Sequence, residues 1–170
     1  MKITLIGYMG SGKTTVGKIL SKKLNLDFYD LDAILIDSNN DSICNIFKKK
    51  GELFFRKKEH FVLKKILIKK NKYVLSVGGG TPCFYNNICL LNKYSNTFYL
   101  KMDSFALFKR LFLEKKTRPL ISHLSKNELF LFIIKHLSTR AYFYEKSLEK
   151  INVCGKTKDD IVQEIVKYFS

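Results

Sequence analysis

The sequence predicts an α/β fold built on a parallel sheet that is covered by helices on both faces. Short runs rich in Leu, Ile, Val and Phe alternate along the 170 residues with longer amphipathic segments, an order typical of strand–helix–strand units. The first apolar run ends on a glycine-rich loop that opens a helix. Because ligands of parallel sheets bind beyond the carboxyl ends of the strands, we expect the functional residues there.

The individual elements follow from the spacing of the apolar residues. The runs predicted to form strands are Lys2–Ile6, Asp27–Tyr29, Tyr73–Val77, Thr97–Lys101 and Ile151–Val153. The segments predicted to form helices are Lys13–Leu24, a stretch from about Leu31, Ser42–Lys50, Glu52–Lys69, Ser104–Leu113, Glu128–Tyr144 and Lys158–Phe169. Val16, Leu20 and Leu24 recur at helical spacing in the first of these, and Gly51 separates the third from the fourth.

Length and composition favour one folded domain spanning residues 1–170. Hydrophobic residues make up 46% of the chain, which argues against disorder, and there is no linker, repeat or low-complexity stretch. No apolar run is long enough for a membrane-spanning helix, and Met1–Ile6 lacks the basic start of a signal peptide. The cysteines form no CxxC pair, so we expect free thiols and a cytoplasmic location; they are Cys44, Cys83, Cys89 and Cys154.

The formal net charge of +16 raises the question of nucleic-acid binding. Only four of the 31 basic residues are arginine, and the lysines are spread along the chain without a block of like charge. We therefore expect most of this charge to be solvated surface and compositional drift, with no nucleic-acid or membrane partner. The charge would still attract anionic substrates.

The strongest motif is Gly7–Thr14, which reads G-x4-G-K-T directly after a strand and at the start of a helix. Gly10 and Gly12 allow the backbone to curl so that its N–H groups point at phosphate oxygens. Lys13 would reach the β- and γ-phosphates, and the Thr14 hydroxyl would ligate Mg²⁺. This segment predicts nucleoside triphosphate binding, but does not say whether the acceptor is water, a nucleotide or a metabolite.

Two carboxylates, Asp30 and Asp32, follow the second strand. Alternation along an extended chain would place both on the same side. Beside a phosphate loop, one could hold the Mg²⁺ shell through water and the other could accept the proton of an acceptor hydroxyl. A helix N-cap is the alternative use of either residue.

The few arginines of this lysine-rich chain are candidates for carboxylate binding, because a guanidinium group binds a carboxylate bidentately and an ammonium group does not. Arg56 and Glu59 lie three residues apart on one helix face, where Glu59 would orient Arg56 or the two would form a surface salt bridge. Arg140 offers a second carboxylate-binding group, and Arg118 lies in a loop that could close on the transferring phosphate. An ordinary surface position is the alternative for either residue. The three histidines share no spacing that indicates a metal site.

Three consecutive glycines, Gly78, Gly79 and Gly80, follow the third predicted strand. They leave bare backbone where a ligand could approach closely. A tight strand-to-loop turn is the alternative, although a turn rarely needs three glycines.

Together these motifs resemble shikimate kinase over nearly the whole chain, from Ile3 to about Phe169. They occur in the family's order: Gly7–Thr14, Asp30–Asp32, Ser42–Phe47, Gly51–Glu59, Gly78–Gly80, Arg118–Leu120 and Arg140 followed by Tyr144. The phosphate loop is generic, whereas the combination of DxD, GE-x-x-FR-x-x-E, GGG and RPL is highly specific. The lid differs mildly, reading RPLI where RPLL is usual.

The resemblance implies a P-loop kinase of the nucleoside-monophosphate-kinase type, with three layers and a five-stranded parallel sheet. The core would comprise about 1–30, 72–110 and 145–170, the substrate-binding region about 31–69 and the lid about 112–124. The implied reaction transfers the γ-phosphoryl group of ATP to the 3-hydroxyl of shikimate, with Mg²⁺ as cofactor, on the route to chorismate and the aromatic amino acids. A cytoplasmic monomer is implied as well.

The resemblance also assigns residues by position. ATP would be bound by Gly10, Ser11, Gly12, Lys13, Thr14, Thr15, Arg110, Arg118 and Lys156. Shikimate would be bound by Asp32, Arg56, Gly78, Gly79, Gly80 and Arg140. Mg²⁺ would be held by Thr14 and, through water, by Asp30; the catalytic residues would be Lys13, Asp32 and Arg118. The Arg110–Arg118 stretch is one residue longer than in relatives, and the loop around Lys156 matches the family's adenine loop poorly.

Three other interpretations stay open at the level of sequence. The first is a kinase of another small acceptor, such as gluconate or a nucleoside monophosphate, although paired arginines suit a carboxylate. The second is a nucleic-acid-binding module, which would use the positive charge but would not need the DxD and GGG motifs. The third is a relative that binds ATP without turnover, which the intact motif set disfavours.

Overall fold

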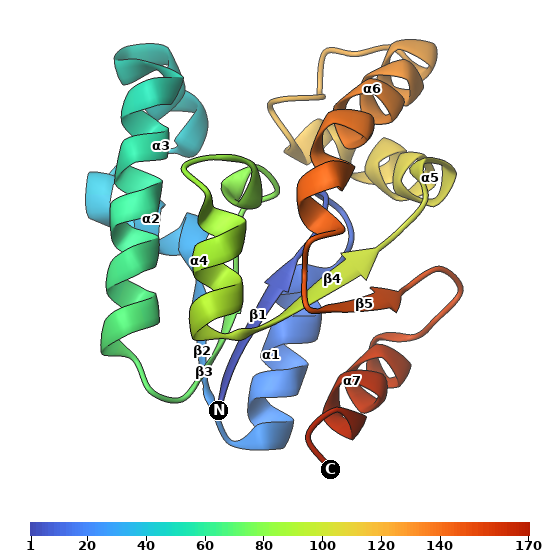
Figure 1. Ribbon diagram of the computed structural model, residues 1–170. Coiled ribbons are helices and arrows are strands. Elements are labelled where there is room, and N and C mark those ends of the chain that lie inside the picture. The colour runs from blue at the N-terminus through green and yellow to red at the C-terminus, as the bar shows by residue number, and fades with distance from the viewer.

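The computed structural model describes residues 1–170 and contains a five-stranded parallel sheet with seven α-helices and two 3₁₀ turns (Figure 1). The strands are β1 (Lys2–Ile6), β2 (Asp27–Asp30), β3 (Tyr73–Ser76), β4 (Asn96–Lys101) and β5 (Glu149–Asn152). The helices are α1 (Lys13–Leu24), α2 (Leu31–Asn39), α3 (Ile43–Lys69), α4 (Asn87–Tyr94), α5 (Ser104–Glu114), α6 (Lys126–Tyr144) and α7 (Lys158–Lys167). The 3₁₀ turns are η1 (Thr81–Cys83) and η2 (Lys115–Thr117).

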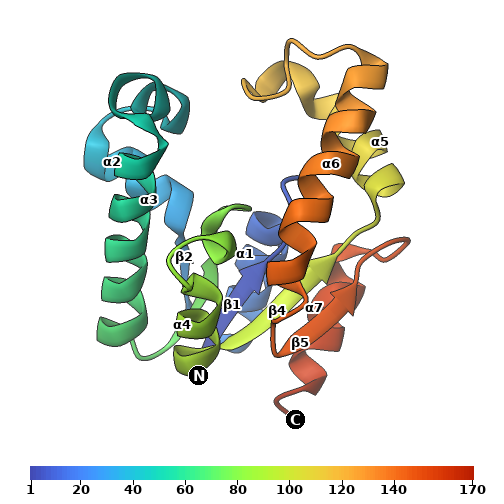
Figure 2. The same cartoon turned by 45° about the horizontal axis from the view of Figure 1, so that its top comes forward.

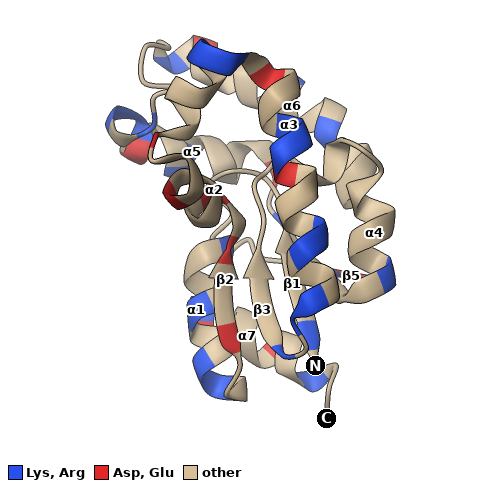
Figure 3. Cartoon of the chain, turned by 90° about the vertical axis from the view of Figure 1, so that its left-hand side faces the viewer, with Lys and Arg blue, Asp and Glu red and all other residues tan.

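The strand order is β2-β3-β1-β4-β5, and every neighbouring pair is parallel. All four residues of β3 and four of the five in β1 are buried, as expected for central strands covered on both faces. Helices α1 and α7 lie on one side of the sheet, and α3 and α4 lie on the other (Figure 3). The predicted fold class is therefore confirmed, and each predicted strand lies within a few residues of an observed one.

The connection after β1 and the connection after β3 run to opposite faces of the sheet. Beside these two central strands the chain forms the topological switch point at which ligands of open α/β sheets bind. Two helical arms, α2 with α3 and α5 with α6, rise on either side of this edge, while both chain termini lie at the opposite end (Figure 2). The fold thus places the carboxyl ends of β1, β2 and β3 at the edge of the sheet from which the two arms rise (Figure 2).

The α3 arm contains the break that the sequence predicts at Gly51. This residue has φ 81° and ψ 166°, which is not helical, so α3 consists of two helical segments across a kink. Helix α4 was not among the predicted elements. It has only eight residues, and its entry needs the positive φ of Asn86, 56°, which no apolar periodicity signals.

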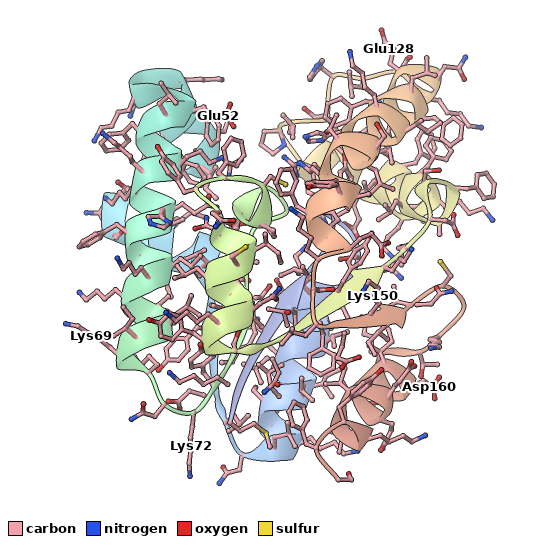
Figure 4. The ribbon with its side chains drawn as sticks, viewed as in Figure 1. Glu52, Lys69, Lys72, Glu128, Lys150 and Asp160 are labelled. Atoms are coloured by element: carbon pink, nitrogen blue, oxygen red, sulfur yellow. The ribbon has the colours of Figure 1, made fainter.

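Lysines lie mostly on exposed surfaces. Lys and Arg are distributed over several helices, with a series along the outer side of α3 (Figure 3). Lys69 and Lys72 point into solvent at the lower end of this arm, whereas Glu52 lies near its upper end (Figure 4). None of the helices has the length and apolar character that crossing a membrane would require.

Candidate active site

The phosphate loop lies between β1 and α1 and forms one wall of a cavity of about 400 Å³. Gly10 and Gly12 have φ 81° and 96°, values that L side chains rarely adopt, so the curl of the loop depends on them. Lys13 Nζ donates hydrogen bonds to the carbonyl oxygens of Gly7 at 2.8 Å and Tyr8 at 2.9 Å. The ammonium group therefore folds back across the loop beside the cavity, where a phosphate would compete for it.

The two carboxylates after β2 both line this cavity, but not for the reason expected from sequence. The chain is extended only as far as Asp30, and Asp32 lies in the first turn of α2, so strand alternation does not relate them. Asp30 is the N-cap of α2 and accepts hydrogen bonds from the backbone N–H groups of Asp32 and Ala33. Its other carboxylate oxygen accepts a hydrogen bond from the Thr14 hydroxyl at 2.8 Å. Asp30 therefore caps α2 and also contacts the phosphate loop.

The three glycines after β3 each face one predicted acceptor-binding side chain. A Cβ at Gly78 would come within 2.8 Å of Asp32 Oδ1, and a Cβ at Gly79 within 3.0 Å of Arg140 Nη1. A Cβ at Gly80 would lie 2.4 Å from Arg56 Nη2, a clash. The glycine loop therefore brings together side chains from α2, α3 and α6, which is a function that a simple turn does not require.

Arg56 is buried and held from three directions. Its Nη1 atom donates to Glu59 Oε2 at 2.8 Å, and its guanidinium group lies 4.2 Å from the centre of the Phe84 ring. Glu59 is itself buried and accepts the Thr81 hydroxyl at 2.6 Å through its second oxygen. The pair is therefore a buried, hydrogen-bonded unit, and the surface salt bridge considered from sequence is excluded. Glu52, which is exposed, adds a longer contact at 3.3 Å.

The third side of the cavity comes from α5 and the segment after it. Arg110 lines the cavity and donates to the Gly10 carbonyl at 2.8 Å. Arg118 also lines it and binds Glu114 Oε2 through Nε at 3.0 Å and Nη2 at 2.5 Å. Lys156 does not line the cavity, since its ammonium group pairs with Glu164; Lys158, two residues further on, does.

The geometry places a phosphate loop beside a cluster of one carboxylate and two guanidinium groups, those of Asp32, Arg56 and Arg140. A family model for shikimate kinase matches residues 9–170. The chain is 45% identical over 167 residues to a shikimate kinase of Flavobacterium psychrophilum, covering 98% of this chain and 97% of the relative. The chain belongs to the shikimate kinase family. A second relative, the shikimate kinase of Azobacteroides pseudotrichonymphae, is 41% identical and matches over 97% of both chains.

Solved structures of shikimate kinases share this fold. The enzyme from Bacteroides thetaiotaomicron superposes with a TM-score of 0.94 at 34% identity, covering 99% of this chain and 98% of that one. The enzyme from Acinetobacter baumannii, solved in complex with shikimate, gives 0.88 at 29% identity, covering 99% and 92%. A deoxyadenosine kinase from M. mycoides gives 0.64 at 17% identity and 99% coverage of both chains, which shows the P-loop kinase fold alone.

Burial shifts the pKa values of two groups in the shikimate kinase site. Burial, with the nearby carboxylates of Asp30 and Glu59, raises the pKa of Asp32 to about 6. Burial also lowers the pKa of the Lys13 ammonium group to about 8, against the opposing effect of Asp32 and Asp30. Two buried groups shifted in opposite directions in one cavity are typical of acid–base and charge-stabilising roles.

Several residues of the site were not found from sequence. Glu114 and Lys158 line the cavity, and Tyr8, next to it in the phosphate loop, forms a hydrogen bond with His136 of α6. Glu114 lies four residues before Arg118, a helical spacing that could have revealed the pair. The contact of Tyr8 with His136 joins residues 128 positions apart, and no local pattern encodes it.

Proposed function

We propose that this chain transfers the γ-phosphoryl group of ATP to the 3-hydroxyl group of shikimate. One observation carries the proposal: Asp32, Arg140 and Arg56 converge on the Gly78–Gly80 loop, next to the phosphate loop that would hold ATP. A small ring that carries both hydroxyl groups and a carboxylate satisfies these side chains. The relatives at 40–45% identity are named shikimate kinases, and one similar structure contains shikimate.

The acceptor carboxylate would be bound by Arg56 and Arg140, whose guanidinium groups approach the glycine loop from opposite arms. Arginine forms bidentate, charge-assisted hydrogen bonds with carboxylate, which supply both affinity and orientation. Burial of Arg56 against Glu59 and Phe84 fixes its planar group before substrate arrives. Preorganisation of this kind lowers the entropic cost of binding.

The donor would lie along the phosphate loop, with Gly10, Ser11 and Gly12 supplying backbone N–H groups and Arg110 flanking the nucleotide. Ser11 Oγ is buried and has no hydrogen-bond partner, which leaves it free to donate to a phosphate oxygen. Lys13 and Arg118 would contact the transferring phosphoryl group once they leave the Gly7 and Glu114 oxygens that they bind here.

The Thr14 hydroxyl and the Asp30 carboxylate suit Mg²⁺, since both are hard oxygen donors, 2.8 Å apart at the mouth of the loop. No cluster of three His, Cys, Asp or Glu side chains gathers anywhere in the chain, so the remaining ligands would be phosphate oxygens and water. Mg²⁺ bound in this way would neutralise negative charge on the phosphates.

In the proposed reaction the shikimate 3-oxygen attacks the γ-phosphorus in line with the β,γ-bridging oxygen of ATP, which leaves as a terminal oxygen of ADP. A bond from the acceptor oxygen to phosphorus forms, the bond to the β,γ-bridging oxygen breaks, and the hydroxyl proton passes to Asp32. Lys13 and Arg118 stabilise the charge on the equatorial oxygens, and positioning contributes most of the rate.

A coupled assay of ADP release tests this function with the purified chain, MgATP and one of three acceptors: shikimate, gluconate or CMP. We expect turnover with shikimate to exceed turnover with the other two, and phosphorus–proton coupling in the NMR spectrum of the product to place the phosphate on the 3-oxygen. Faster turnover with gluconate or CMP, or ATP binding without any acceptor-dependent ADP release, would contradict the proposal.

A further inference from the structure

Tyr8, in the phosphate loop, contacts α6 through its side chain. The residue is 1% exposed, and its hydroxyl oxygen lies 2.9 Å from Nδ1 of His136. The two rings also pack edge to face, with centroids 5.5 Å apart and an interplanar angle of 84°. A buried aromatic side chain with a satisfied hydroxyl is well fixed, so this contact joins the phosphate loop to α6 at one defined place.

Arg140 lies one helical turn after His136, so the two side chains share a face of α6. The guanidinium carbon of Arg140 is 5.9 Å from the centre of the Tyr8 ring. Tyr8 therefore contacts His136 through its hydroxyl group and faces Arg140 with its ring. On the other side, Tyr144 donates its hydroxyl hydrogen bond to the Gly79 carbonyl at 2.6 Å. Arg140 therefore lies between the phosphate loop, at Tyr8, and the glycine loop, at Gly79.

We propose that Tyr8 and His136 are a positioning pair that fixes the Arg140 guanidinium group for the carboxylate of the acceptor. The pair holds the α6 face against the phosphate loop, so that donor and acceptor sites keep one spacing. This inference rests on the proposed function, because it assigns Arg140 to the acceptor.

The charge state of the pair suits this role. Burial and the guanidinium groups of Arg140 and Arg56 lower the pKa of His136 to about 4. Burial raises the pKa of the Tyr8 phenol above its ordinary value. Both groups are therefore neutral in the physiological range, and either imidazole tautomer sustains the bond, since a phenol both donates and accepts. A neutral partner orients Arg140 without repelling it and without competing for its charge.

A change at Tyr8 could also affect activity through the phosphate loop itself. The Tyr8 carbonyl oxygen accepts the Lys13 Nζ hydrogen bond at 2.9 Å, so a change that disturbed the loop would affect ATP. The two routes predict different kinetics. A positioning role toward Arg140 raises the KM for shikimate and leaves the KM for ATP near its original value, whereas loop damage raises the KM for ATP.

The first variant is Tyr8→Phe, which keeps the ring and removes only the hydroxyl group. We expect the KM for shikimate to rise about three- to tenfold, the size of one neutral hydrogen bond, with kcat and the KM for ATP changed less than about twofold. On the background of Arg140→Lys the same change should add little, because residues that act through one group are not additive. If the effects of Tyr8→Phe and Arg140→Lys on the KM for shikimate were fully additive, or if only the KM for ATP rose, the proposed positioning role of Tyr8 and His136 would be wrong.

The second test compares two variants of His136. Asn places a polar atom at the position of Nδ1, whereas Leu places a methyl group there. We expect His136→Leu to reproduce the rise in KM of Tyr8→Phe and His136→Asn to recover most of the loss. Equal KM values for shikimate in the two His136 variants would contradict the proposed positioning role. Failure of the wild-type chain to phosphorylate shikimate would instead contradict the proposed function, so the two failures are distinguishable.

Discussion

Nη1 of Arg56 lies 2.8 Å from Oε2 of Glu59, and the side chains are only 8% and 1% exposed. Glu59 uses its other oxygen for the Thr81 hydroxyl at 2.6 Å. The carboxylate thus links the arginine proposed to bind shikimate to the residue that follows the glycine loop. Because both its oxygens accept hydrogen bonds from donors, no neutral side chain of the same shape can replace it fully.

Glu59→Gln should destabilise the protein, because Gln would present an NH₂ group to one of the two donors, and the Arg56 charge would lose its buried partner and keep only the exposed Glu52. We expect a loss of about 2–4 kcal/mol in the free energy of unfolding, measured by chemical denaturation, together with a higher KM for shikimate. Glu52→Gln is the matched control: this side chain is 53% exposed and 3.3 Å from Arg56, so its loss should cost less than about 0.5 kcal/mol. Equal effects of the two variants would show that burial does not decide the strength of this pair.

Arg56→Lys should raise the KM for shikimate about 10- to 100-fold, because an ammonium group cannot replace a bidentate guanidinium contact. The KM for ATP should stay near its original value. Arg110→Lys is the complementary variant, since Arg110 contacts the Gly10 carbonyl in the cavity proposed for ATP. It should raise the KM for ATP and leave shikimate binding intact. Steady-state kinetics with each substrate varied in turn separates the two, and a shared pattern would contradict both assignments.

Asp32→Asn should lower kcat about 10²- to 10⁴-fold, because an amide cannot accept the proton of the attacking hydroxyl group. ATP affinity, measured by calorimetry, should change little. Asp37→Asn serves as control, since Asp37 lies on the same helix but is exposed and does not line the cavity. A kcat of Asp32→Asn close to that of the wild-type chain would remove Asp32 from the proposed mechanism.

The pH dependence of kcat/KM for shikimate should be bell-shaped. The pKa of Asp32 is raised to about 6, so activity should fall as the pH drops below this value and the carboxylate becomes protonated. The pKa of Lys13 is lowered to about 8, so activity should fall again above that pH as the ammonium group loses its charge. The residual activity of Asp32→Asn should lack the acidic limb; an unchanged acidic limb would assign it to another group.

Local sequence patterns predicted the five strands and every α-helix except α4, but only part of the site. The phosphate loop, the break at Gly51 and the buried strands follow from residue spacing, because each is fixed by its own segment. Asp30 and Asp32 both line the cavity, as predicted, but the predicted reason was wrong, since helix capping by Asp30 ends the strand before Asp32. Lys156 pairs with Glu164, and Tyr8 meets His136 from the far part of the chain. Neither contact follows from apolar periodicity, and the second, across 128 residues, depends on tertiary packing.

Glu114 supplies the last prediction, because it holds Arg118 at 2.5 Å and places a negative charge in the cavity proposed for ATP. Glu114→Gln should free Arg118 for the phosphates and remove a repulsive charge, lowering the KM for ATP about two- to fivefold at low salt. Stability should barely change, since exposed ion pairs contribute at most about 1 kcal/mol. Glu145→Gln is the control, as the Glu145–Lys101 pair has similar exposure and lies outside the nucleotide cavity. A higher KM for ATP in Glu114→Gln would instead mean that Glu114 keeps Arg118 in its working position, and that the pair persists when the nucleotide binds.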